Sequence, residues 1–333
     1  MNNLYKINRQ NWFKQLQDLA VSSYNIYAPV RTDGGIDYTL LGKEGTDEIV
    51  YNEAKPITPL KMFFLPIKIN VTRSTEVSKK TIIIGAPACD VEGLKLLDQI
   101  YLDEQFVDYS YLSRREESII IATDCYKTME HCHCSTYGIN PYPTEGCDIS
   151  LSSKNDEIYL THWSEKGKQF IINLNSVGQL QKIENNHIEA ISVKRRQIID
   201  ELTLKNERLP GTDITGERIK MSAKKIWEKY SAKCVSCGAC SAICPTCSCF
   251  LLIDRPNFEK VKQQDTCQYP AFARVAGGED SLKDLSIRFK NRYMCKFIWK
   301  PKRFNSVACT GCGRCIEACI GKISKNELIM ELV

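Results

Sequence analysis

The sequence predicts an α/β N-terminal domain over residues 1–210 and a mainly α-helical C-terminal domain over residues 211–333. Three observations support this division. A strand, a helix and a strand follow one another in the first part, residues 148–233 contain none of the 17 cysteines, and a Pro-Gly pair begins at Pro210. A chain of 333 residues is also longer than one hydrophobic core usually supports, so two domains are expected.

The strand–helix–strand pattern is the strongest secondary-structure signal. Residues 81–85 (TIIIG) and 118–122 (SIIIA) are short apolar runs typical of buried strands, and residues 91–102 between them carry apolar side chains at helical spacing. This βαβ pattern predicts a partly parallel sheet. Cys89 and Cys125 each follow one of the strands, so both thiols are expected at the carboxyl edge of the sheet, where open α/β sheets bind ligands.

Two further helical regions are expected near the domain boundary. Residues 179–204 are rich in Gln, Lys, Glu and Ile at helix-like spacing, which predicts one or two connecting helices. Residues 216–233 predict one amphipathic packing helix that leads into the C-terminal cysteines.

The composition is that of a folded globular protein, with 43% apolar and 26% charged residues. The net charge of +5 is too small to argue for nucleic acid as a partner. Neither a signal-peptide core nor a run of about 18 apolar residues is present, so no secretion and no membrane span are expected. We therefore expect a reducing cytoplasm, where clustered cysteines more often bind metals than form disulfides. No Gly-rich phosphate loop is present, so no bound ATP or dinucleotide is expected.

One cysteine motif occurs twice in the second half of the chain, with spacings of two, two and three residues. In two-cluster ferredoxins, three cysteines of each run hold one [4Fe–4S] cluster and the fourth serves the other cluster. The predicted ligands are Cys234, Cys237, Cys240 and Cys319 for cluster 1, and Cys309, Cys312, Cys315 and Cys244 for cluster 2. Zinc also takes CxxC pairs, but two complete runs of four favour iron–sulfur clusters. Pro245 follows the first run, whereas Ile320 follows the second.

A long insert, residues 245–308, separates the two runs. It is expected to form helices and an irregular loop, so a helical two-cluster module is favoured over a compact β-hairpin ferredoxin.

Several motifs together resemble a known family. They are ACDVEGLKLLD (88–98), CHCSTYG (132–138), CPTCSCF (244–250), DTC (265–267), AGG (276–278), CKF (295–297) and CTGCGRC (309–315). Over roughly residues 25–325 the chain is similar to the family formed by the A subunits of anaerobic sulfite reductases and the β-subunits of sulfhydrogenases.

The resemblance implies a [4Fe–4S] electron-transfer subunit of a cytoplasmic anaerobic complex. One partner would be a flavin-containing NAD(P)H oxidoreductase subunit. The other would be a terminal subunit, either a sulfite reductase or a nickel–iron hydrogenase. The resemblance does not separate these two terminal subunits.

Four N-terminal cysteines match motif positions of this family: Cys89, Cys125, Cys132 and Cys134. They suffice for a third [4Fe–4S] cluster. The alternatives are a zinc site, which His131 and His133 suggest, and unligated thiols. If residues 132–134 are extended, the histidines point away from the thiols, so neither is expected as a ligand. Cys147 stands where the family has an aromatic residue and receives no role.

Four C-terminal cysteines remain outside the two runs: Cys247, Cys249, Cys267 and Cys295. They are candidates for a fourth iron–sulfur site, and in the resembled family a histidine usually stands at the position of Cys295. The alternative is that they are small buried apolar residues.

Residues 285–315 contain no acidic residue. The stretch carries Arg288, Lys290, Arg292, Lys296, Lys300, Lys302, Arg303 and Arg314, interleaved with aromatic residues. Because an oxidised cubane with four thiolates has a formal charge of about −2, compensation of cluster charge is a better interpretation than a nucleic-acid surface.

The favoured hypothesis is an iron–sulfur electron carrier with no catalytic residues of its own. A second hypothesis is a catalytic reductase of a sulfur compound that uses an unusual cluster at the four remaining cysteines. A third is a zinc-stabilised binding module, which would be colourless.

Overall fold

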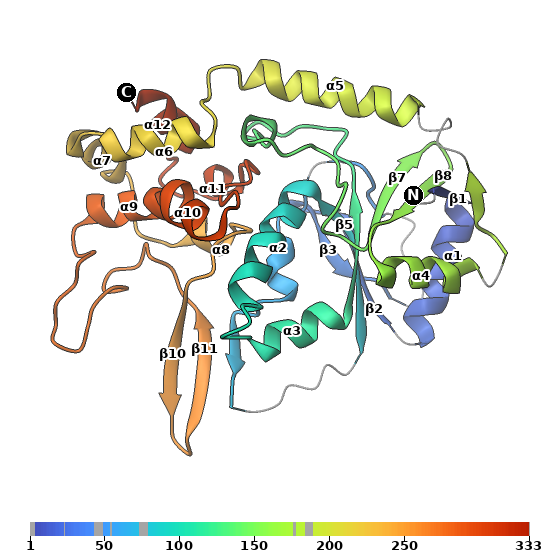
Figure 1. Cartoon of the computed structure of the whole chain (residues 1–333), viewed down its shortest axis with the longest axis horizontal. Coiled ribbons are helices and arrows are strands. Elements are labelled where there is room, and N and C mark those ends of the chain that lie inside the picture. The colour runs from blue at the N-terminus through green and yellow to red at the C-terminus, as the bar shows by residue number, and fades with distance from the viewer. Residues whose placement is uncertain are drawn as a thin grey trace.

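An eight-stranded mixed sheet forms the centre of the N-terminal part (Figure 1). The structure is a computed structural model that describes residues 4–22, 24–42, 49–53, 55–72, 79–175, 178–183 and 189–332. The strands are β1 (Leu4–Asn8), β2 (Tyr24–Thr32), β3 (Gly35–Leu40), β5 (Lys80–Pro87), β6 (Ser118–Thr123), β7 (Ile149–Lys154), β8 (Glu157–His162) and β9 (Gln181–Ile183). Their order is β3-β2-β5-β6-β7-β8-β1-β9, and β2, β5, β6 and β7 run parallel.

Helices cover both faces of this sheet. They are α1 (Arg9–Ser22), α2 (Ala88–Tyr101), α3 (Tyr109–Glu116) and α4 (Glu165–Asn175). Because successive strand side chains point to opposite faces, Ile82 and Ile84 of β5 pack with α1 and α4, whereas Ile83 packs with α2 and α3. The predicted βαβ unit is confirmed as β5, α2 and the parallel strand β6.

The C-terminal part is mainly helical. Its helices are α6 (Thr212–Met221), α7 (Lys224–Ser231), α8 (Ala239–Ala242), α9 (Leu285–Met294), α10 (Lys300–Phe304), α11 (Arg314–Glu317) and α12 (Lys325–Glu331), with a π-helical turn at Cys295–Trp299. An aromatic core that includes Trp227, Tyr293 and Phe297 holds these helices together. The helical character predicted for this part is confirmed.

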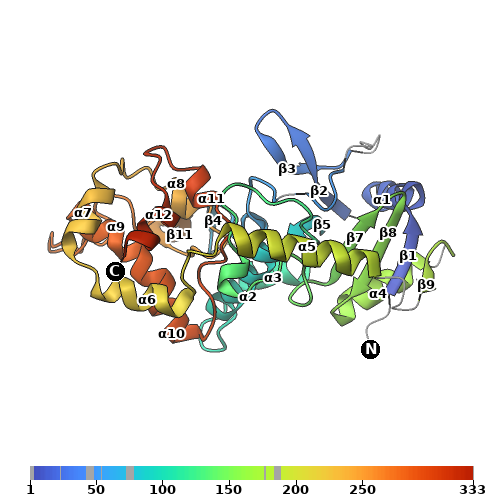
Figure 2. The ribbon, with the colours of Figure 1, turned by 90° about the horizontal axis from the view of Figure 1, so that it is seen from above.

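The two parts lie side by side and are tied together at several places (Figure 2). Helix α5 (Glu189–Lys205) runs from the sheet toward the C-terminal helices, and its Ile198 and Leu202 pack against Cys134. A second, three-stranded sheet joins β4 (Lys68–Asn70) to the hairpin of β10 (Phe250–Arg255) and β11 (Glu259–Gln264). The turn between α5 and α6 contains the boundary expected near residue 210, and the division at that point stays a prediction.

Three sequence expectations need correction. Residues 179–204 contain the short strand β9 as well as helix α5, and residues 184–188 lie outside the described residues. The insert, residues 245–308, contains the β10–β11 hairpin in addition to helices.

The single helix expected over residues 216–233 is instead two helices. The backbone turns extended at Ser222, with ψ 135°. The Ser222 hydroxyl donates to the Ile219 carbonyl at 2.7 Å and accepts from the Trp227 indole at 2.8 Å. This local hydrogen bonding competes with helix continuation, which is a common effect of serine.

None of the described helices is long and apolar enough to cross a membrane.

Replacing Leu94 by alanine should destabilise the sheet–helix packing that positions Cys89. Leu94 is 1% exposed on α2, so Leu94→Ala should lower the free energy of unfolding by about 2–5 kcal/mol in chemical denaturation. The control Ile172→Ala, at a half-exposed position of α4, should change it by less than about 0.5 kcal/mol. Equal losses in the two variants would contradict the assigned core.

Candidate iron–sulfur sites

The first group of cysteines surrounds a cavity in the C-terminal part. Cys234, Cys237, Cys240 and Cys319, the predicted ligands of cluster 1, all line it, and so does Cys315. Gly238 makes the turn between Cys237 and α8, with φ +74°. A β-carbon there would stand 2.6 Å from Thr266 and 2.7 Å from Tyr269, so only glycine fits. The fourth cysteine of the second run therefore reaches the cavity of the first run.

The second group lies around the segment that follows Cys244. Cys312 lies close enough to Cys244 and Cys315 to interact with them electrostatically. Lys296 interacts in the same way with both Cys244 and Cys309. The Thr246 hydroxyl donates to the Ala308 carbonyl at 2.6 Å, which joins the Cys244 segment to the start of the second run. The predicted ligands of cluster 2 are therefore neighbours.

The third group lies at the carboxyl edge of the large sheet. Cys89 begins α2, Cys125 follows β6, and Cys132 and Cys134 come from the next loop; all four line one cavity, together with Cys312. The N-terminal cysteines therefore meet each other and also adjoin the second group.

A close backbone contact makes this meeting possible. The His133 amide donates to the Gly311 carbonyl at 2.9 Å. Gly311 has φ +64°, and a β-carbon there would stand 2.6 Å from the Cys134 backbone. The CTGCGRC motif thus uses Gly311 to bring Cys312 against the N-terminal loop.

The two histidines of this loop do not line the N-terminal cavity. The extended conformation considered for residues 132–134 is not found, because Cys134 has helical dihedral angles and starts a 3₁₀ turn. His133 is fully buried, and its Nε2 lies 2.8 Å from Lys325 Nζ. Burial, and then Lys325, lower the pKa of His133 well below its ordinary value, so its ring is neutral at pH 7.

Within the described residues, no group of three or more Cys, His, Asp or Glu side chains is arranged to hold a single metal ion. A cubane is larger than one ion, so the thiolates around it stand farther apart. Cys147 is separate from these groups and packs in the apolar core beneath α2.

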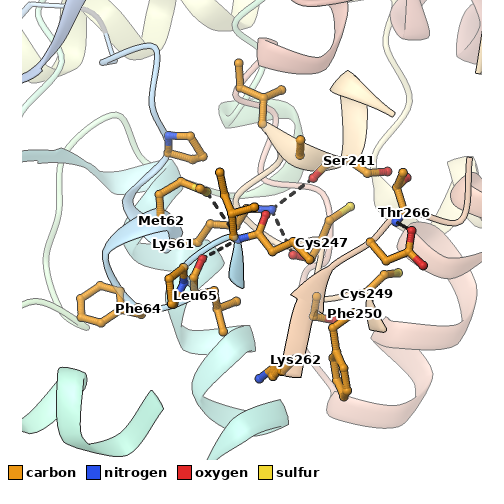
Figure 3. A pocket seen from close by; sticks show the side chains of 18 of the residues that line it. Lys61, Met62, Phe64, Leu65, Ser241, Cys247, Cys249, Phe250, Lys262 and Thr266 are labelled. Atoms are coloured by element: carbon orange, nitrogen blue, oxygen red, sulfur yellow. Dashed lines mark hydrogen bonds between the residues drawn. The ribbon is translucent and has the colours of Figure 1, made fainter. Parts of the chain in front are cut away.

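The remaining C-terminal cysteines are also neighbours. Cys267, Cys247 and Cys295 all lie close enough to Cys249 to interact with it electrostatically. Cys247 and Cys249 also line a cavity of about 380 Å³ between the two parts of the chain, shown in Figure 3.

Buried positive charge accompanies these groups of thiols. Seven basic residues of the described part are buried: Lys55, Lys61, Arg288, Arg292, Lys296, Arg314 and Lys325. Only two of them form salt bridges among the described residues, Lys55 with Glu317 and Arg314 with Asp90. The other five are buried cations without a carboxylate partner in that part of the chain.

Arg292 is the clearest case. Burial lowers its pKa, but the surrounding Cys240, Cys315, Cys247 and Cys244 outweigh this and raise it well above its ordinary value. Its Nε atom is buried without a hydrogen-bond partner among the described residues. Lys296 and Lys325 are similar, and Lys325 Nζ lies 3.4 Å from Cys309 Sγ.

These cations fit anionic clusters. Leaving a charge buried and unpaired is strongly destabilising, whereas each oxidised cubane with its four thiolates supplies a formal charge of about −2. The thiols alone supply only part of this charge at pH 7. The neighbouring Cys247 lowers the pKa of Cys244 well below its ordinary value, and Cys249 lowers that of Cys267 to about 6. Burial raises the pKa of Cys312 to about 12 and that of Cys240 to about 11. Iron binding would displace these protons and create the missing negative charge.

Comparison with known proteins agrees with this chemistry. A sequence family described as "4Fe-4S dicluster domain" matches residues 233–323. The chain is also 29% identical to "Sulfhydrogenase 2 subunit beta" of Pyrococcus furiosus, over 96% of this chain and 95% of that protein. The chain resembles a sulfhydrogenase β-subunit along nearly its whole length. The resemblance that the cysteine motifs suggested is therefore confirmed.

Sequence reasoning missed three of the buried cations. Arg288, Arg292, Lys296 and Arg314 belong to the basic stretch noticed in the sequence, and the structure buries all four. Arg292, Lys296 and Arg314 lie beside thiols. Arg288 instead donates to backbone carbonyls and to the Ser236 hydroxyl. Lys55, Lys61 and Lys325 are far from that stretch in sequence and gave no signal, because an isolated lysine is usually a surface residue.

Replacing a buried cation should change a reduction potential. Lys296→Met removes the charge beside Cys244 and Cys309, so the nearest cluster should become harder to reduce, by on the order of tens of millivolts. The exposed Lys302→Met is the matched control and should leave the potential unchanged. Electron paramagnetic resonance (EPR) during a redox titration measures both, and equal potentials in the two variants would refute the charge-compensation account.

Replacing Gly311 should disturb the contact between the N-terminal loop and the second run. Gly311→Ala should destabilise the protein by about 1–3 kcal/mol and reduce its iron content, because the β-carbon meets the Cys134 backbone and φ is positive. Gly277→Ala, at a position with open space, is the control. Thermal unfolding and iron analysis provide the comparison, and an unaffected Gly311 variant would contradict the described contact.

Proposed function

We propose that this chain is an iron–sulfur electron-transfer subunit of an anaerobic cytoplasmic redox complex. The single observation that carries the proposal is a set of four cations that are buried beside thiols and have no carboxylate partner among the described residues: Lys61, Arg292, Lys296 and Lys325. Two [4Fe–4S] clusters would be held by the ferredoxin-type runs and a third by Cys89, Cys125, Cys132 and Cys134. Such clusters accept and release one electron at a time, and the chain itself makes no bond.

The arrangement of the thiol groups suits a relay. Cys312 of the second group lines the cavity of the third group, and Cys315 of the second group lines the cavity of the first. A cysteine of the second group thus lies at each of the other two groups, which keeps the electron-transfer distances between the groups short. The role of the buried Arg292, Lys296 and Lys325 would be to stabilise the reduced, more negative clusters.

The relative's name supports the proposal that this chain works in an assembly. A protein named as the β-subunit of a sulfhydrogenase belongs to an assembly, and we propose the same for this chain. A flavin-containing NAD(P)H oxidoreductase subunit would exchange electrons on one side. A terminal hydrogenase or sulfite reductase subunit would do so on the other, with the hydrogenase type favoured by the relative's name.

The second candidate is a catalytic reductase of a sulfur compound. The observation that favours it is the cavity of about 380 Å³, which Cys247 and Cys249 line (Figure 3). A small substrate in this cavity would lie against thiols and against buried Lys61.

Electron transfer by the isolated chain separates the two candidates. The chain, purified without oxygen, should be reduced by dithionite and reoxidised by a one-electron acceptor, with no turnover of polysulfide or sulfite. NAD(P)H alone should not reduce it until a flavin-containing oxidoreductase is added. Steady turnover of a sulfur compound with an artificial donor would instead establish a catalytic reductase.

A further inference from the structure

We propose that Cys247, Cys249, Cys267 and Cys295 hold a further iron–sulfur cluster that branches from the second ferredoxin-type site. This inference rests on the proposed electron-transfer function and adds one redox centre to it. Four thiolates are the usual ligand set of both [2Fe–2S] and [4Fe–4S] clusters.

Three separate segments bring these thiols together. Cys247 and Cys249 precede β10, Cys267 follows β11, and Cys295 begins the π-helical turn after α9. The base of the hairpin is closed where the Asp265 amide donates to the Cys249 carbonyl at 3.0 Å. The hairpin thus places Cys249 beside Cys267.

The backbone at Cys295 is an independent indication. A π-helical turn runs from Cys295 to Trp299 between the α-helical segments α9 and α10. Such turns are rare and occur frequently at functional sites, since they lower stability and persist where they position a side chain. Cys295 in this turn lies within electrostatic range of Cys249, and the buried Lys296 lies within range of Cys244 and Cys247.

The surroundings are cationic and polar, which does not suit four plain apolar residues. Arg292 faces Cys247 and Cys267, and Lys61 faces Cys247. Both cations are buried, and neither forms a salt bridge among the described residues.

Hydrogen-bond donors also reach this group. Lys61 Nζ donates to the Cys247 carbonyl at 3.1 Å, as Figure 3 shows, and Gln268 Nε2 donates to Cys267 Sγ at 3.4 Å. Cations and sulfur-directed donors are the groups that stabilise and tune a bound cluster.

The position of the site makes the second group a junction. The Cys247 amide donates to the carbonyl of Cys244, a predicted ligand of cluster 2, at 3.3 Å. The second group therefore adjoins the first group through Cys315, the N-terminal group through Cys312, and the proposed site through Cys244. The proposed cluster would stand between this junction and the cavity of about 380 Å³, where a partner or a small acceptor can approach.

Iron and sulfide counts on matched variants test the proposal. Compared with the wild type, the double variant Cys249→Ser/Cys267→Ser should lose two irons for a [2Fe–2S] cluster or four for a [4Fe–4S] cluster, with equal sulfide and the corresponding EPR signal. The control Cys147→Ala removes a buried cysteine from the apolar core and should keep every iron. Unchanged iron in the double variant would overturn the proposal.

One further measurement covers the case in which the double variant does not fold. If the double variant fails to fold, native mass spectrometry of the wild type and of Cys295→Ser replaces it, and the same cluster mass in both would overturn the proposal. A wild type that contains iron in the two ferredoxin-type sites but loses none in these variants contradicts only this inference. A wild type without iron contradicts the proposed function itself.

Discussion

Unpaired positive charge inside the protein is the constraint on which the C-terminal part depends. Arg292, Lys296 and Lys325 are buried beside thiols, and the described residues offer them no carboxylate. A buried cation needs a counter-charge, and protonated thiols such as those of Cys240 and Cys312 do not provide one. Cluster binding therefore serves folding and function together, because the same anionic group that carries electrons also neutralises the interior. The two salt-bridged cations, Lys55 and Arg314, stand where the two parts of the chain meet.

Close backbone contacts give the thiol groups their arrangement. Gly238 and Gly311 adopt positive φ values where a side chain would collide with a neighbouring segment, so the cysteine loops pack directly against each other. The buried Arg314–Asp90 pair links the second run to the start of α2, next to Cys89. The relay proposed across the two parts of the chain would depend on this contact, which joins residues 224 positions apart in sequence.

Local sequence patterns made much of this structure predictable. The remaining features depend on long-range contacts and could not be predicted from the sequence. The βαβ unit and the repeated cysteine spacing are local signals, and both point to features that the fold contains. The helix break at Ser222 depends on the Trp227 side chain. The hairpin β10–β11 gains its third strand from residues 68–70. Neither feature can be predicted from a short stretch of sequence. The meeting of Cys134 with Gly311, and the burial of Lys55, Lys61 and Lys325, likewise exist only after folding.

The metal content of the wild-type chain, purified without oxygen, tests the central claim most directly. Iron, acid-labile sulfide and zinc are determined on the same sample. Clusters in all four thiol groups predict about 12 iron atoms from the three groups of the proposed function plus two to four more from the fourth, with matching sulfide and no stoichiometric zinc. A colourless protein that contains zinc without iron would contradict the account, because zinc bound by these thiols would not provide electron transfer.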